Sequence, residues 1–553
     1  MSCSVKTRHD QKQFLDFFQK KEFPKALEVL DHSSLTEKEQ RLLYLMEKGS
    51  LYYYQNLFFD AAMIFNEANE LVDSLYTKSV KEIIASSIIN ENSKTFFGSI
   101  YERSLLYYYG AMSFYRLSNL TSFEKEVEKE GKKVKEKVEL TESDKKANIN
   151  KSRSFLIAWD SFFQEIGRSN KNKSIQQYDL LAKLMAGKLH LAYKTKRDDD
   201  IALQLFKDAY MILNEISPTY KSFNENFKDY NLKYRDYLKS ETKKPSTKEI
   251  AETDYFLQTK KDIQENIYYL TNKYRKNELR EVRKNYLKGF DSKNYKTTNI
   301  EIVIENGYVS PLKPKDIAIN LKTAVESIEN KNTRAVVEGI GIPVLTYFAL
   351  GPLGLGAVSH GRNYSIYTSH NVGTSLTKEV GIEFEVPHVD EPKSLNSMEI
   401  QFYQNEKLIK TIKPYIAGAV SDYAFISNQE NLENTFSKRA ARVGGKYILA
   451  IIAAYNTYNT MNKNGGELFA KPAAFGQFLV SQKAIKESEK ADSRHWSTLP
   501  SNILGASLNL SEGSYKAKLI EYAGDKTSIV RSVDLGEFQV NDSSQSLFSF
   551  RAL

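Results

Sequence analysis

The sequence predicts an all-α N-terminal part made of repeated helix pairs, followed by an α+β domain with an antiparallel sheet. Three observations support this fold class. A spacing of small and aromatic residues recurs within the first 215 residues, and the hydrophobic period changes from helical to alternating near residue 300. Glycine (26) and proline (12) are scarce in a chain of 553 residues that is 41% hydrophobic and 27% charged, which favours a helix-rich globular protein of two or three domains.

The recurring spacing is that of the tetratricopeptide (TPR) repeat, in which small residues let two helices approach and large residues fill the space between them. Gly49 allows close contact between the two helices, and Phe65 is expected to fill their interior. Ala61 and Ala68 keep the inner face of the second helix shallow. Seven positions are in register over 24 residues: Leu45, Gly49, Tyr52, Phe58, Ala61, Phe65 and Ala68.

The same separations return elsewhere in the first part of the chain. A second copy consists of Tyr193, Ala202, Phe206 and Ala209. A weaker copy opens the chain at Phe17, Phe23, Ala26 and Leu30. A possible fourth copy, with Gly110 and Tyr115 in one helix and Ala158 and Phe162 in a later one, is interpreted as ordinary amphipathic helix.

Two further segments are predicted from composition and hydrophobic period. The Lys- and Glu-rich stretch from about 121 to 152 is interpreted as an insertion, either an extended solvated helix or a mobile loop. Residues 220–294 are predicted to form long, charged, Tyr-rich helices. We therefore expect an anchor or linker at 1–9, a TPR-like helical domain at 10–295 and an α+β domain at 296–553.

Alternating residues and turn signals predict the strands of the C-terminal half. Residues 299–305 alternate and are followed by the turn signal Asn306-Gly307. A hairpin is predicted around Asn405-Glu406. The strands are expected at 299–305, 382–386, 398–402, 408–412, 505–510, 514–522, 528–535 and 547–551, with a helix at 431–458 between them.

Residue patterns that carry chemistry are scarce. No Walker A sequence, nucleophile elbow or close pair of metal ligands occurs. Among seven scattered histidines, His360, His370 and His388 share a loop-rich region and could converge. The net charge of +9 is spread over 78 basic and 69 acidic residues, which is typical of a solvated surface. We expect no catalytic residue, cofactor, metal or nucleic-acid partner.

The single cysteine, Cys3, stands directly after Met1 and Ser2. Either it is a chance cysteine of a cytoplasmic protein, or it is the mature end of a lipoprotein to which a start codon has been added. Ser2-Cys3 fits the last two positions of a bacterial lipobox, and Ser4 fits outer-membrane sorting. The most apolar stretch, 335–358, contains Glu338, two prolines and five glycines and is interpreted as a buried segment rather than a membrane span.

The most distinctive local sequence surrounds Trp496, one of two tryptophans. A helical stretch from about 475 to 491 precedes it, and Leu499-Pro500 imposes an extended path after it. We expect Trp496 to be a structural staple between that helix and the terminal sheet rather than a ligand site, with Arg494 paired to a carboxylate.

These residues resemble a family of bacterial outer-membrane lipoproteins of no known activity, which have TPR-like N-terminal helices and a C-terminal Ala-Asp-x-Arg-x-Trp-x-x-Leu-Pro motif. Supporting similarities include Gly307, Val309 and Pro311 after the first strand and the basic pair Arg439 and Arg442. The lysine-rich insertion departs from the family. The motif is matched by Ala491, Asp492, Arg494, Trp496, Leu499 and Pro500.

The resemblance implies a lipoprotein anchored to the outer membrane through a lipid on Cys3 and facing the periplasm. We expect it to be a non-enzymatic scaffold or adaptor that binds protein partners through a TPR-like groove. Its envelope assembly would serve peptidoglycan synthesis, a flagellum or secretion. Two alternatives stay open: a cell-wall hydrolase that uses carboxylates of the α+β half, and a cytoplasmic TPR regulator.

Overall fold

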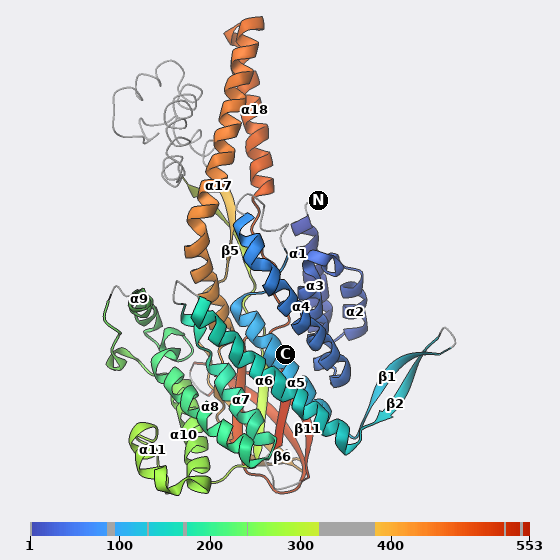
Figure 1. Ribbon diagram of the computed structural model, residues 1–553, viewed down its shortest axis with the longest axis vertical. Helices are drawn as coiled ribbons and strands as arrows, with labels where there is room; N and C mark the ends of the chain where they lie inside the picture. Colours follow the sequence, from blue (N-terminus) through green and yellow to red (C-terminus); the bar gives the residue numbers. More distant parts are fainter. Residues whose placement is uncertain are drawn as a thin grey trace.

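The computed structural model describes residues 3–85, 95–129, 132–169, 174–239, 242–319, 382–524, 527–541 and 546–553. The stretch 335–358 and the histidines at 360 and 370 lie outside these ranges. Figure 1 shows a body of helices and sheets from which two long helices and one β-hairpin project.

The N-terminal part is helical, as predicted. Its first helix begins at Cys3, so residues 3–9 belong to a helix. The helices are α1 (Cys3–Gln19), α2 (Phe23–Asp31), α3 (Arg41–Tyr54), α4 (Phe58–Ala85), α5 (Ile100–Ser118), α6 (Glu142–Ser169), α7 (Leu180–Ala192), α8 (Lys196–Glu215), α9 (Phe227–Leu238), α10 (Asp254–Tyr274) and α11 (Leu279–Asn285).

Three helix pairs, α1–α2, α3–α4 and α7–α8, are joined by turns of one kind. In each turn a residue with positive φ stands two positions before the second helix: Lys21 (φ 59°), Asn56 (φ 60°) and Lys194 (φ 61°). A single left-handed residue reverses the chain after a helix and lets the next helix run back along the first. The three pairs therefore share their connection as well as their order.

The C-terminal part contains antiparallel-rich sheets, as predicted. One four-stranded sheet has the order β12-β3-β9-β8 and the other has the order β11-β10-β6-β7. Only β12 and β3 among the described pairs run parallel. The strands are β3 (Ile300–Asn306), β4 (Lys313–Ile319), β5 (Ile382–His388), β6 (Met398–Gln404), β7 (Lys407–Ile412), β8 (Tyr415–Gly418), β9 (Asn502–Leu508), β10 (Gly513–Tyr522), β11 (Ile529–Val540) and β12 (Ser546–Ala552).

The sheet β12-β3-β9-β8 is the middle layer of the body. On one face of β12, Phe548 and Phe550 contact Phe538 of the second sheet, with ring centroids 4.9 and 5.9 Å apart. On the opposite face, Ser549 hydrogen-bonds the Tyr53 hydroxyl of α3 at 3.0 Å. The layers are therefore helices, first sheet and second sheet, and side-chain alternation along β12 serves both interfaces.

One hydrophobic core runs through both halves of the chain. It extends from Phe14 of α1 to Ala552 of β12 without a break at residue 295. The polar side chains of β3 face the helices: Glu301 accepts a hydrogen bond from Lys188 of α7, and Glu305 accepts one from Tyr108 of α5. The helical array thus wraps the sheet.

The insertion near 121–152 is neither an extended helix nor an irregular loop throughout. It contains a hairpin of β1 (Ser122–Lys129) and β2 (Lys132–Glu139), after which α6 begins. Glu124 and Glu126 stand opposite Lys137 and Lys135 on one face. These cross-strand pairs of opposite charge, each worth roughly 0.2–1 kcal/mol, favour a hairpin over a helix.

The predicted helix at 431–458 is part of the longer α17 (Val420–Gly465), which pairs with α18 (Glu467–Ser488). The two helices project from the body (Figure 1). At their base, Glu489 is almost fully buried and pairs with Arg442 at 2.8 Å and Lys446 at 2.7 Å. Within the described ranges, no helix combines the length and apolar character that a membrane span requires.

Candidate functional site

The predicted packing residues of the helix pairs lie at the contacts between the helices. A Cβ on Gly49 would stand 2.6 Å from the Phe65 ring, and a Cβ on Gly187 would stand 2.8 Å from the Phe206 ring. Each glycine of the first helix therefore makes room for the phenylalanine of the second. Ala61, Ala68, Ala202 and Ala209 are fully buried beside these rings, Tyr193 is buried, and Tyr52 is half-buried.

The helix pair α5–α6 has the same contact, although a hairpin separates its two helices. A Cβ on Gly110 would lie 2.2 Å from the Phe155 ring. The sequence interpretation considered Phe162 for this place and preferred an ordinary helix. The structure selects Phe155, which has Ala158 three residues later, as Phe65 has Ala68 and Phe206 has Ala209.

Trp496 lies in a different interface from the predicted one. Its ring is fully buried beside Phe65 and Tyr109, with centroids 6.0 and 5.5 Å away. The indole Nε1–H donates to Ser50 Oγ of α3 at 2.9 Å. Trp496 therefore joins the segment after α18 to α3, α4 and α5, because the extended path through Leu499-Pro500 crosses the helices before it enters β9.

The rest of the motif fixes this crossing. Arg494 pairs with the Asp492 carboxylate through Nε at 2.8 Å, as the sequence predicted. It also donates a hydrogen bond from Nη1 to Gln40 Oε1 of the helical array at 3.0 Å. Leu499 is fully buried, and Pro500 is buried. The motif is thus a structural junction between the helical array and the sheet.

Two carboxylates at this junction were not predicted from the sequence. Glu47 of α3 accepts hydrogen bonds from the backbone and hydroxyl groups of Ser497 and Thr498, at 2.7 to 3.3 Å. Glu102 of α5 accepts the Trp496 backbone N–H at 2.6 Å. Burial raises the pKa of Glu47 to about 7, against the lowering effect of its hydrogen bonds. The only sequence feature that could have indicated a role for Glu47 is its position as a lone glutamate in an otherwise apolar helix.

A buried ionic cluster lies between α7, α10 and the first sheet. The Lys188 ammonium donates to Asp262 at 2.8 Å, to Glu301 at 2.7 Å and to Ser507 at 2.8 Å. The Tyr415 hydroxyl also donates to Glu301 at 2.7 Å. All donors of the lysine are thereby used within the protein, so the cluster ties the layers together rather than presenting a reactive group.

A large groove lies on the outer side of the helical array. It has a volume of about 1430 Å³ and is lined by α6, α7 and α8. Its lining exposes the apolar side chains of Ile157 (66%), Ile201 (36%), Tyr178 (45%) and Met211 (47%). Single exposed apolar side chains are common on protein surfaces, but several of them in one groove indicate an interaction surface.

Arg153 of α6 pairs with Asp198 of α8 at 2.6 Å, and a further ionic bridge crosses the floor of the groove. Ala182 and Ala186 of α7 line it with short side chains. Lys183 lies between them and reaches both walls, pairing with Asp160 of α6 at 2.6 Å and with Asp208 of α8 at 3.5 Å. The bridge holds the walls at a fixed separation, so the groove is preformed.

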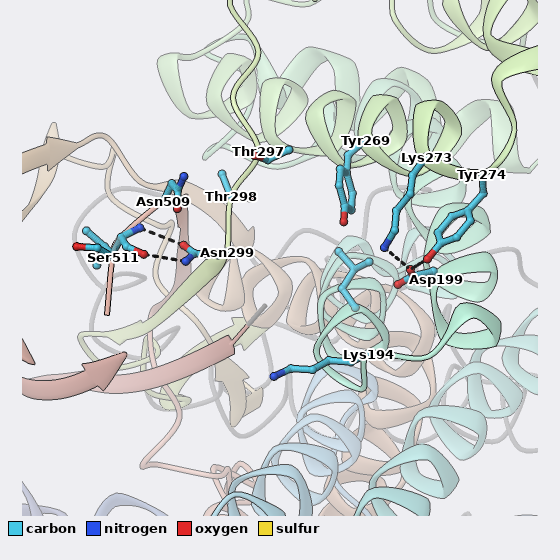
Figure 2. A pocket seen from close by; sticks show the side chains of 12 residues that line it. Lys194, Asp199, Tyr269, Lys273, Tyr274, Thr297, Thr298, Asn299, Asn509 and Ser511 are labelled. Carbon is cyan, nitrogen blue, oxygen red and sulfur yellow. Dashed lines mark hydrogen bonds and ion pairs between the residues drawn. The ribbon is translucent and has the colours of Figure 1, made fainter. Parts of the chain in front are cut away.

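A second pocket, of about 800 Å³ and polar in its lining, lies between α10, the start of α8 and the turn from β9 to β10 (Figure 2). Asp199 accepts hydrogen bonds from Lys273 at 3.1 Å and from the Tyr274 hydroxyl at 2.6 Å. Asn299 forms two hydrogen bonds with the backbone of Leu510, at 2.8 and 3.0 Å. Both walls are therefore held by internal contacts.

The remaining candidate residues do not form a site in the described ranges. His388 lies 3.5 Å from Asp390, and no group of three or more potential metal ligands occurs in the part of the chain that is described. Cys3 is the first residue of α1. Comparison of the chain with protein-family models, curated proteins and solved structures found no match.

Proposed function

We propose that this protein is a non-catalytic scaffold or adaptor that binds a protein partner in the bacterial cell envelope. The groove between α6 and α8 carries the proposal, because its exposed apolar side chains and alanine floor suit a helix of another protein. A lipid on Cys3 would hold the protein at the periplasmic face of the outer membrane.

Three contacts support a TPR-like classification of the helical array. Gly49, Gly110 and Gly187 each face a phenylalanine of the following helix, at 2.6, 2.2 and 2.8 Å from the place of a Cβ. The left-handed turn residues repeat at equivalent positions in three pairs. Repeats of this kind bury their apolar faces by stacking and leave grooves that bind extended or helical segments.

The partner site differs from the inner groove that the sequence suggests. The inner face, formed by α3, α5 and α7, contacts the first sheet through Tyr53, Tyr108 and Lys188. Because the protein's own strands occupy that face, a partner would bind the outer groove instead. An amphipathic helix fits best, since its apolar stripe would lie on Ala182 and Ala186 between the two walls.

The buried carboxylates support a structural rather than a hydrolytic role. Glu47, Glu301 and Glu305 face the interface between helices and sheet, and each accepts hydrogen bonds from the protein. A cell-wall hydrolase needs two carboxyl groups that face an open cleft and flank the scissile bond.

Photo-crosslinking in intact cells tests the proposal. A photoreactive amino acid at Ile157, in the groove wall, should yield a discrete protein adduct. The adduct should be lost when Met211→Asp introduces a charge on the opposite wall. The matched control is the same probe at Leu232, which is 60% exposed on α9 outside the groove. Equal adducts from both probes, or an adduct that survives Met211→Asp, would contradict groove binding.

A further inference from the structure

The projecting hairpin of α17 and α18 carries few charges along its outer part. Between residues 447 and 482 the sequence has only three charged residues, Lys463, Glu467 and Lys471, whereas 27% of the whole chain is charged. Figure 1 shows that the hairpin extends past the N-terminus, away from the helices and sheets of the body. An ordinary surface helix is polar on the side that faces solvent, so the scarcity of charge needs a physical reason.

The contact between the two helices defines the inner face of each. The rings of Tyr447 in α17 and Phe478 in α18 have centroids 6.4 Å apart. Ala470 and Ala474, two turns and one turn before Phe478, are buried as well. The inner face of α18 therefore runs through Ala470, Ala474 and Phe478.

The opposite face of α18 is apolar and exposed. Because successive residues of a helix are rotated by about 100°, a residue two positions beyond a contact lies on the far side of the helix. Phe469 is 65% exposed and Val480 is 67% exposed on this side. A Cβ on Gly476 would meet no atom of the described chain within 4 Å. We call the exposed residues of this face the outer stripe: Phe469, Pro472, Gly476 and Val480.

The surroundings of the outer stripe favour an anionic membrane over a protein groove. Lys483 is exposed one turn beyond Val480 on the same face, and Lys463 is exposed in the last turn of α17. An apolar stripe with lysines beside it is typical of a helix that lies in the membrane interface, with its apolar face about 5–10 Å deep. The stripe is about 17 Å long, which is too short to cross a hydrocarbon core of about 30 Å but suits a helix parallel to the surface.

The base of the hairpin is held against α1. Arg8 donates a hydrogen bond from Nη2 to the Ala491 carbonyl at 2.7 Å, and Gln11 donates one from Nε2 to the His495 carbonyl at 2.8 Å. Cys3 is the first residue of α1, and the hairpin extends past it (Figure 1). A lipid on Cys3 and the outer stripe would therefore lie toward the same end of the molecule.

We propose that the outer stripe of α18 binds the surface of a membrane that contains anionic phospholipids. Phe469, Pro472 and Val480 would enter the boundary between headgroups and acyl chains, and Lys463 and Lys483 would contact lipid phosphates. The groove between α6 and α8 takes no part in this contact, and the test uses protein without a lipid on Cys3. This proposal and the proposed function can therefore fail separately.

Vesicle flotation of the full-length Cys3→Ser protein tests the proposal. The protein should float with vesicles of phosphatidylcholine and phosphatidylglycerol, and its binding to pure phosphatidylcholine should be about tenfold weaker or more, since each lysine near an anionic surface strengthens binding about fivefold. Val480→Asp should weaken binding to the mixed vesicles about tenfold or more, because it removes a buried apolar contact and adds a repelled charge.

Leu449→Asp is the matched control. Leu449 is 67% exposed, as Val480 is, but it lies two residues after Tyr447 and so faces the opposite side of the hairpin. This variant should bind the mixed vesicles within twofold of the parent protein. Absence of flotation, equal binding to both kinds of vesicle, or equal losses in Val480→Asp and Leu449→Asp would overturn the proposal.

A fluorescent label gives a second readout that adds no charge. Cys3 is the single cysteine of the chain, so Val480→Cys or Leu449→Cys in the Cys3→Ser protein provides one labelling site. On addition of mixed vesicles, the emission of a polarity-sensitive label should shift to shorter wavelength at position 480 and stay unchanged at position 449. This pair decides if Val480→Asp fails to fold. A shift at position 480 that needs only a higher protein concentration, without vesicles, would assign the stripe to a second copy of the chain and contradict membrane binding.

Discussion

Replacement of Trp496 by alanine tests the central junction of the fold. The indole ring is fully buried against Phe65 and Tyr109, and its Nε1–H donates to Ser50. Removing a buried tryptophan costs about 3–5 kcal/mol through lost burial and the remaining cavity. The Ser50 hydroxyl also loses a partner, which adds about 1 kcal/mol. We expect the free energy of unfolding to fall by about 4–6 kcal/mol.

The location of the loss is as informative as its size. Because the ring joins the segment after α18 to α3, α4 and α5, both the helices and the first sheet should lose stability together. Urea unfolding gives the total, and hydrogen exchange measured on peptides of α3, α5, β3 and β9 gives the distribution. Trp496→Phe, which keeps most of the ring but removes the N–H, is the control and should cost about 1–2 kcal/mol.

Two results would refute this reasoning. A total loss below about 1 kcal/mol would mean that the ring is not buried in the native protein. If protection from hydrogen exchange were lost only in the terminal sheet, with α3 and α5 unchanged, Trp496 would instead join α18 to that sheet, as the sequence suggested.

Three further predictions concern other parts of the chain. Gly49→Ala should lower the free energy of unfolding by about 1–3 kcal/mol, because the new Cβ would lie 2.6 Å from the Phe65 ring, and adding Phe65→Leu should restore part of it in urea titrations. Burial raises the pKa of Glu305 to about 7, above its value in the unfolded chain. Its contribution to stability is therefore fully present below about pH 4.5 and is lost as the pH rises through 7, by about 3 kcal/mol, so Glu305→Gln should flatten the pH dependence of the urea midpoint over that window. With protein expressed from the native gene, a metabolic fatty-acid label should appear on the wild type and be absent from Cys3→Ser, and equal labelling would exclude Cys3 as the acylated residue.

Local spacing predicted much of the helical array and several strands. The hairpin around Asn405 and Glu406 follows β6 and precedes β7, and both turn residues have positive φ, 49° and 61°. Such hairpins depend on residues that are close in the sequence, so they can be predicted from the hydrophobic period and from the residue types at the turn. The β1–β2 hairpin was missed because its charges were counted by composition, although Phe123 and Val127 alternate with glutamates along one strand.

Long-range contacts could not be predicted in this way. Glu47 looks like an isolated polar residue of an apolar helix, and its partner Ser497 is 450 residues away. Likewise, the alternation of Glu301 and Glu305 along β3 predicts a strand but does not identify what covers its polar face. Lys188 and Tyr108 cover it, and this contact merges the two expected domains into one core.

The parallel pair of β3 and β12 has a consequence for how the chain folds. Arg551 of β12 donates to the Glu305 carbonyl of β3, although the two residues are 246 positions apart. Contacts between such distant segments close large loops and slow folding. The inner faces of α3 and α5 cannot be covered until β12, at the end of the chain, is available to pair with β3. The helical array therefore exposes apolar surface until the whole chain is present where it folds, and we expect it to depend on chaperones until then.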